Sequence, residues 1–123
     1  MNIEDCYRRM GGSYEDVMMR LPSASMVERF AVKFLDDGSF EELGHQLKCG
    51  NREAAFKAAH TLKGVSSNLS FSRLSESTGV LTEALRPSDA VINEHVHELY
   101  SYVKRDYELT ITAIREFVER KDR

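Results

Sequence analysis

One histidine of the sequence, His60, is placed where its ring would be accessible to another molecule. His60 is central to residues 51–70, NREAAFKAAHTLKGVSSNLS, a segment with a helical pattern. When residues are placed at roughly 100° intervals around a helix, the apolar ones gather on one face: Ala55, Ala58, Leu62, Val65 and Leu69. His60 falls on the opposite face, so its ring is predicted to point into solvent. An exposed neutral imidazole is a nucleophile near physiological pH and is suited to accept a phosphoryl group.

Three neighbours of His60 fit a site that receives a phosphoryl group. Gly64 lies one turn further along the helix, where a glycine lowers helix stability by about 1 kcal/mol relative to alanine. Its missing side chain would let another protein surface approach the ring. Lys63, on the other flank, offers a positive charge to an anion carried by His60, and Ser67 keeps the next turn small. We therefore predict His60 as the phosphoryl acceptor and Lys63 as the residue that stabilises the phosphoryl group.

Further residues of the same helix are candidates for partner binding. Phe56 precedes His60 by one turn and would supply contact area in a docking surface, although an exposed phenylalanine without a role is the alternative. Lys57 is a candidate of the same kind, with an ordinary solvated lysine as the alternative. Asn68 lies at the edge of the face, where a partner contact and a plain surface amide fit the sequence equally. The predicted partner-binding residues are Phe56, Lys57, Gly64, Ser67 and Asn68.

The residues around His60 resemble the signature of a known family. His60-Thr-Leu-Lys63-Gly64, followed by Ser66-Ser67-Asn68-Leu69, looks like the motif of histidine-containing phosphotransfer (HPt) domains of multistep two-component signalling. The resemblance extends from residues 7–12 and 30–35 to residues 71–86, and so covers most of the chain. One position departs from the pattern, because the family commonly has a glycine where this chain has Ser70.

The resemblance implies a role in a phosphorelay. His60 would take a phosphoryl group from the aspartyl phosphate of a receiver domain and pass it to the aspartate of another receiver. The receiver would supply Mg²⁺, so no cofactor and no metal site are expected in this chain. The partners implied are response-regulator receiver domains and a hybrid sensor histidine kinase.

The expected chemistry is that of a carrier and not of an enzyme. The sequence has no Walker A motif and no kinase-type glycine-rich loop, so we expect a phosphocarrier without an ATP site. The alternative to a relay is a non-catalytic helical interaction module, a pseudo-HPt that docks a receiver or kinase without carrying phosphate.

Length and composition fit a small cytoplasmic protein. The 123 residues have the size of one domain, and we expect residues 1–123 to fold as a single HPt-like domain. The net charge of −3 comes from interspersed acidic and basic residues, which gives no basis for binding nucleic acid or a membrane surface. Two cysteines without metal-ligand spacing are interpreted as reduced thiols. Without a secretory leader or a membrane-spanning apolar run, we expect a cytoplasmic monomer.

Helices are predicted along the whole chain. Start and stop signals place them at residues 3–10, 14–21, 25–37, 39–49, 51–69, 72–86 and 89–120. Ser25-x-x-Glu28 and Ser39-x-x-Glu42 are interpreted as capping boxes, and Asn51 as the N-cap of the helix with His60. Short connections favour antiparallel neighbours. The predicted fold is therefore all-α, an antiparallel up-and-down four-helix bundle with short additional N-terminal helices.

Overall fold

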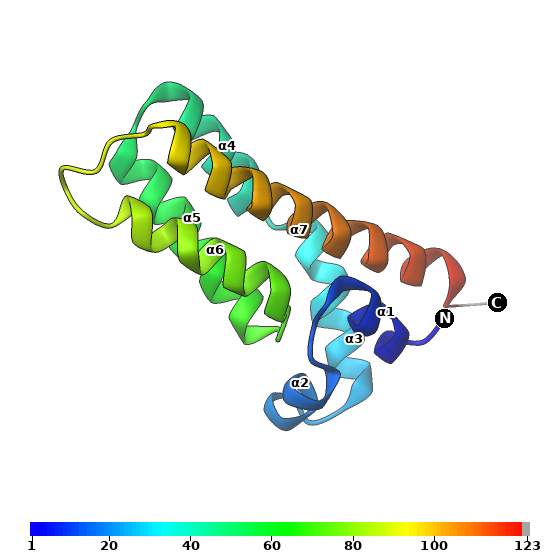
Figure 1. Ribbon diagram of the computed structural model, residues 1–123. Coiled ribbons are helices and arrows are strands. Elements are labelled where there is room, and N and C mark those ends of the chain that lie inside the picture. The colour runs from blue at the N-terminus through cyan, green and yellow to red at the C-terminus, as the bar shows by residue number, and fades with distance from the viewer. Residues whose placement is uncertain (122–123) are drawn as a thin grey trace.

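The computed structural model describes residues 1–121, and all regular secondary structure within them is helical (Figure 1). The elements in chain order are α1 (Ile3–Met10), α2 (Tyr14–Arg20), α3 (Ala24–Lys33), the 3₁₀ helix η1 (Phe34–Asp36), α4 (Ser39–Cys49), α5 (Arg52–Asn68), α6 (Ser72–Leu85) and α7 (Glu94–Arg120). The prediction of an all-α fold is confirmed.

Helices α4 to α7 form a four-helix bundle. Helix α5 packs against α4 on one side and α6 on the other, and α6 packs against α7. Figure 1 shows the chain reversing direction at each of the connections between them. Aromatic rings close the bundle between α4 and α7, because Phe40 stacks on Tyr107 at a centroid distance of 4.0 Å and on Tyr100 at 5.6 Å. The predicted antiparallel bundle is therefore confirmed.

The short N-terminal helices pack at one end of the bundle. Helix α1 lies against α7, whose 27 residues span about 40 Å at roughly 1.5 Å per residue. The hydroxyl of the buried Tyr7 donates a hydrogen bond to the Leu69 carbonyl at 2.7 Å. The N–H of Ser13 donates to the Ser70 carbonyl at 2.9 Å. These bonds attach the N-terminal helices to the end of α5, the helix that carries His60.

The buried face of α5 differs in part from the predicted one. The residues that enter the core are Ala55, Ala58, Ala59, Leu62 and Ser66. Val65 and Leu69 are only half-buried, because they face α3 and η1 across a groove. Ser66 satisfies its buried hydroxyl by donating to the Leu62 carbonyl at 2.8 Å. His60 lies away from the buried face and is exposed, as predicted.

Both predicted capping boxes are wrong. Helix α3 begins after Ser23 and not Ser25, because Ser23 has the extended backbone of an N-cap, with φ −153° and ψ 155°. Its hydroxyl accepts a hydrogen bond from the N–H of Met26 at 3.2 Å. In α4, Ser39 is already the first helical residue. The carboxylate of Asp37 takes over the capping role there and accepts from the Ser39 N–H at 2.9 Å.

Asparagine side chains set the starts of α5 and α7. Asn51 accepts a hydrogen bond from the Ala54 N–H at 3.1 Å and is the N-cap of α5, as predicted. Asn93 accepts from the Val96 N–H at 3.0 Å, so α7 begins at Glu94 and not near residue 89. The stretch between α6 and α7 is consequently a longer connection than expected.

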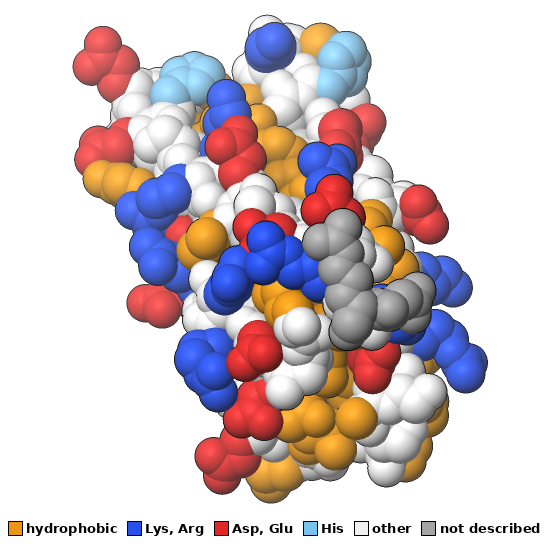
Figure 2. All heavy atoms as spheres, turned by 90° about the vertical axis from the view of Figure 1, so that its right-hand side faces the viewer, with side chains coloured by type: hydrophobic (Ala, Val, Ile, Leu, Met, Phe, Trp, Pro, Cys, Tyr) orange, Lys and Arg blue, Asp and Glu red, His pale blue; other side chains and the backbone are white. Residues whose placement is uncertain are grey.

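The surface is mixed in charge over most of the face shown in Figure 2. Acidic and basic side chains alternate there, and hydrophobic ones gather toward the lower end, where Figure 1 places α2. Met19 of α2 is 81% exposed. In the part of the chain that the structure describes, no helix combines the length and the apolar character needed to cross a bilayer.

Candidate functional site

His60 lies near the middle of α5 with its side chain exposed to solvent. The helix is held on both sides by α4 and α6, and the residue just before the histidine, Ala59, is fully buried. The ring of His60 therefore projects from a rigid support. Local sequence explains this geometry, because small alanines allow close packing of the buried face while the opposite face carries polar residues.

Phe56 connects His60 to the end of α6. Its half-buried ring stacks on the His60 ring, with centroids 6.0 Å apart and planes inclined by 23°. Arg86, which follows the last residue of α6, places its guanidinium carbon 5.1 Å from the Phe56 ring centroid, within the range of a cation–π contact. The sequence predicted Phe56 beside His60, and the structure adds a cation from α6 to this pair.

Glu83 holds the guanidinium of Arg86 through several hydrogen bonds. Arg86 Nε donates to both carboxylate oxygens at 3.1 Å, and Nη2 donates to Oε2 at 2.7 Å. The hydrogen bonds from Arg86 lower the pKa of the Glu83 carboxyl, and the charges of Arg86 and Lys63 and the nearby His60 ring lower this pKa further. Glu83 thus shares one electrostatic environment with both His60 and Lys63. The histidine is surrounded by two cations and one anion.

Lys63 and Gly64 flank His60 in different ways. The stem of Lys63 runs along α6, because a Cβ added at Gly79 would lie 3.4 Å from Lys63 Cε. The glycine at position 79 therefore leaves room for the lysine stem, whose charged end remains exposed. A Cβ added at Gly64 would meet nothing within 4 Å. Packing within the chain does not require this glycine, and the surface beside His60 is open.

The other predicted partner-binding residues are spread around this cluster. Lys57 pairs with the Glu53 carboxylate at 3.5 Å and lines a hollow between α4 and α5. Ser67 is half-buried and its hydroxyl is 2.5 Å from that of Ser75, so it joins α5 to α6. Asn68 is exposed at the end of α5, two turns beyond the histidine. His60, Phe56, Lys63 and Gly64 thus form one cluster, and Lys57, one turn before His60, lies at its edge toward α4.

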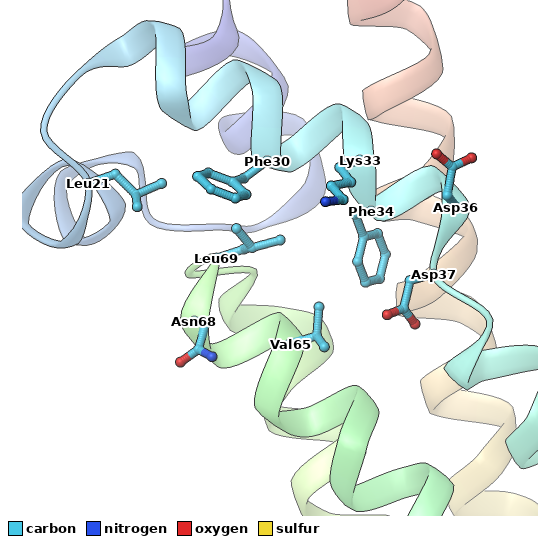
Figure 3. Close-up of a pocket in the computed structure, with 9 residues that line it drawn as sticks. All are labelled: Leu21, Phe30, Lys33, Phe34, Asp36, Asp37, Val65, Asn68 and Leu69. Atoms are coloured by element: carbon cyan, nitrogen blue, oxygen red, sulfur yellow. The ribbon is translucent and has the colours of Figure 1, made fainter.

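A groove of about 510 Å³ opens beside Asn68, between the end of α5 and the segment formed by α3 and η1. Figure 3 shows the side chains of Leu21, Phe30 and Leu69 directed into the same space, with Val65 nearby and Asn68 pointing away from it. Most of the exposed lining is apolar. The half-burial of Val65 and Leu69 is explained by this groove, which the sequence did not predict.

Sequence reasoning did not identify Gly79, Glu83 and Arg86 as neighbours of the histidine. One signal was available, since Glu83 and Arg86 are three residues apart and therefore share a helix face. Their position near the end of α6 becomes relevant only because this end packs beside Phe56. The guanidinium of Arg52 helps to fix it there by donating to the Leu85 carbonyl at 2.7 Å.

Comparison with known protein families identifies the kind of module. A family model described as the Hpt domain matches residues 26–117, most of the chain, including the segment around His60. Comparisons with curated proteins and with solved structures returned no significant match. Hpt domains are phosphocarrier modules that interact with receiver domains and histidine kinases. The matched residues and the helical bundle show that this chain belongs to the Hpt domain family, the phosphotransfer modules of two-component signalling.

Proposed function

We propose that this chain relays a phosphoryl group between the aspartates of receiver domains, with His60 as the phosphoryl acceptor. The observation that supports this most strongly is the exposed imidazole in the middle of α5, beside a glycine whose added Cβ would touch nothing within 4 Å. A nucleophile with an open approach is what an incoming receiver requires.

In the proposed reaction, a lone pair on a neutral ring nitrogen of His60 attacks the phosphorus of the receiver's aspartyl phosphate. The P–N bond forms as the acyl phosphate P–O bond breaks, and the aspartate leaves as a carboxylate. The second ring nitrogen keeps its proton, so the ring carries a positive charge beside the phosphoryl group. Attack by the carboxylate of a second receiver reverses these steps and returns the electron pair to His60.

The neighbours of His60 have separate roles in this proposal. Lys63, whose stem is supported by α6, holds its ammonium near the phosphoryl group and attracts the negative charge. Gly64 allows the active-site loops of the receiver to approach the ring. The charge on the transferring oxygens is offset mainly by Mg²⁺ that the receiver binds, so this chain needs no cofactor of its own.

We further propose that the bound receiver covers the groove beside Asn68. His60, Gly64 and Asn68 follow at intervals of four residues and lie on one side of α5. The groove is consequently about 12 Å along the helix from the histidine. A standard interface buries about 800 Å² on each partner, which is enough to reach from His60 to the groove. The apolar lining by Leu21, Phe30 and Leu69 would supply buried area, while Asn68 would contribute a polar contact at the rim.

Replacement of the histidine tests the proposed function. We expect His60→Gln to change the free energy of unfolding by less than about 0.5 kcal/mol, as for other exposed positions, and to abolish phosphoryl uptake. The assay incubates the chain with Mg²⁺ and receiver domains that have been phosphorylated beforehand, and urea denaturation provides the control for folding. Uptake by the variant would show that His60 is not the acceptor. A wild-type chain that binds such receivers but never acquires phosphate would support the pseudo-HPt alternative.

A further inference from the structure

The ion pair between Glu83 and Arg86 lies beside the histidine but has no part in the transfer described above. Arg86 rests on Phe56 at 5.1 Å from its ring centroid, and the same ring stacks on His60 at 6.0 Å. The guanidinium and the imidazole are thus both in contact with one aromatic side chain. All donors of Arg86 that the structure shows in hydrogen bonds point to a single carboxylate, that of Glu83.

We propose that Glu83 and Arg86 form a latch that responds to phosphorylation: Glu83 holds Arg86 in the free chain, and Arg86 binds the phosphoryl group once His60 carries it. This inference rests on His60 being the phosphoryl acceptor. It assigns Arg86 as a second positioning cation beside Lys63. It also assigns Glu83 as the group that limits how firmly the phosphoryl group is retained.

The exchange of partners is favoured by charge and geometry. A phosphoryl group carries a charge of about −1.5 to −2 near neutral pH, more than the single charge of a carboxylate. Its oxygens can also accept two parallel hydrogen bonds from a guanidinium. The side chains of Arg86 and Glu83 are 52% and 62% exposed, and an ion pair that exposed adds little stability. Breaking this pair is therefore easy once a stronger anion is present.

The rest of the cluster holds its position while the guanidinium moves. Arg52 fixes the end of α6 through its hydrogen bond to the Leu85 carbonyl. The half-buried Phe56 ring stays in contact with the Arg86 guanidinium while the guanidinium changes partner. After the exchange, the carboxylate of Glu83 remains close enough to compete with the phosphoryl group for the donors of Arg86. A carrier that must give its phosphoryl group away benefits from such a competitor, because Arg86 then holds the group only temporarily.

The test uses the complete chain phosphorylated with phosphoramidate, a small-molecule donor that requires no receiver. Two quantities are measured: the ¹H–¹⁵N resonance of the Arg86 Nε–H group before and after phosphorylation, and the half-life of phosphohistidine at pH 8. We expect the Arg86 resonance to shift when His60 is phosphorylated. We expect Glu83→Gln to lengthen the half-life about two- to fivefold, and Arg86→Gln to shorten it by a similar factor, the range expected for one exposed charge pair.

The double variant separates a latch from simple repulsion. If Glu83 acts by holding Arg86, adding Glu83→Gln to Arg86→Gln changes the half-life little, because the cation is already absent. A half-life that Glu83→Gln lengthens equally with and without Arg86 would overturn the latch. Glu53→Gln is the matched control, since Glu53 is a similarly exposed acid in an ion pair on α5, and we expect it to leave the half-life unchanged.

Failure of the latch can be distinguished from failure of the relay. If His60 becomes phosphorylated but the Arg86 resonance does not move, the latch is wrong and the relay stands. If neither phosphoramidate nor phosphorylated receivers modify His60, both proposals are wrong.

Discussion

Gly64 allows stability and function to be separated at one position. It lies inside α5, and a Cβ added there would meet nothing within 4 Å. Gly64→Ala therefore gains helix propensity without a clash, and we expect it to raise the free energy of unfolding by about 1 kcal/mol. For a domain of this size the midpoint of thermal unfolding should rise by about 3–6 °C. Urea and thermal denaturation measure both quantities.

A larger side chain at the same position should oppose the function. Gly64→Gln keeps most of the gain in stability, since glutamine is a good helix former, but it places a long side chain where the receiver must approach. We expect transfer from a phosphorylated receiver to slow about tenfold to hundredfold, the effect of misplacing reacting groups by about 1 Å. Transfer at the wild-type rate would refute the idea that the glycine clears the approach.

Gly44 provides the matched comparison for stability. It also lies within a helix, but a Cβ added there would come within 2.7 Å of the Tyr100 hydroxyl oxygen. Gly44→Ala should therefore lose the gain in helix propensity to steric conflict. If Gly64→Ala failed to stabilise the chain, or if both substitutions stabilised it equally, the assignment of Gly64 as a position free of structural constraint would be wrong.

Three further predictions concern stability and are checked by denaturation. The buried Thr78 hydroxyl has no hydrogen-bond partner within residues 1–121, so Thr78→Val should stabilise the chain by about 1 kcal/mol; a loss would indicate an unseen partner. The buried Asp106 carboxylate accepts from Arg73 Nε at 2.9 Å, so Asp106→Ala should cost about 2 kcal/mol; a neutral effect would contradict this. The hydrogen bond from Ser70 lowers the pKa of Asp16. Because the pKa of Asp16 is lower in the folded chain than its unfolded value of about 3.9, the carboxylate stabilises the fold at pH values above about 3.9, and this stabilisation is lost as the pH falls through the folded pKa. Asp16→Asn should therefore make the free energy of unfolding less sensitive to acid. The measurement is the free energy of unfolding as a function of pH.

The helices and the exposed side of His60 could be predicted because their signals are local. Caps such as Asn51 and the helical period of apolar residues each depend on a few neighbouring positions. The predictions failed where two signals competed within a few residues. Ser23 and Ser25 both fit an N-cap, and only the backbone conformation decides between them.

The composition of the site could be predicted only in part, because it depends on how helices pack. The lysine and glycine next to His60 in sequence were identified, whereas Glu83 and Arg86 reach the cluster only through the packing of α6 on α5. Lys57 was grouped with the site from its place on the helix. In the structure it also pairs with Glu53 and lines the hollow between α4 and α5, which the sequence did not predict.

Ser70 shows how a departure from the family pattern is accommodated. Its backbone has φ +57°, a left-handed conformation that favours glycine. The serine hydroxyl donates to the Asp16 carboxylate at 2.6 Å, and the Ser70 carbonyl accepts from Ser13. These contacts from the N-terminal helices hold the strained residue in place. The sequence alone did not connect the two segments.

The central claim is that the His60 imidazole carries the phosphoryl group. The most direct measurement incubates the chain with phosphorylated receivers and Mg²⁺ and then locates the phosphate by mass spectrometry at alkaline pH. We expect one acid-labile, base-stable phosphate, and we expect it on His60. Phosphate on any other residue, or none after binding of the phosphorylated receiver, would contradict it.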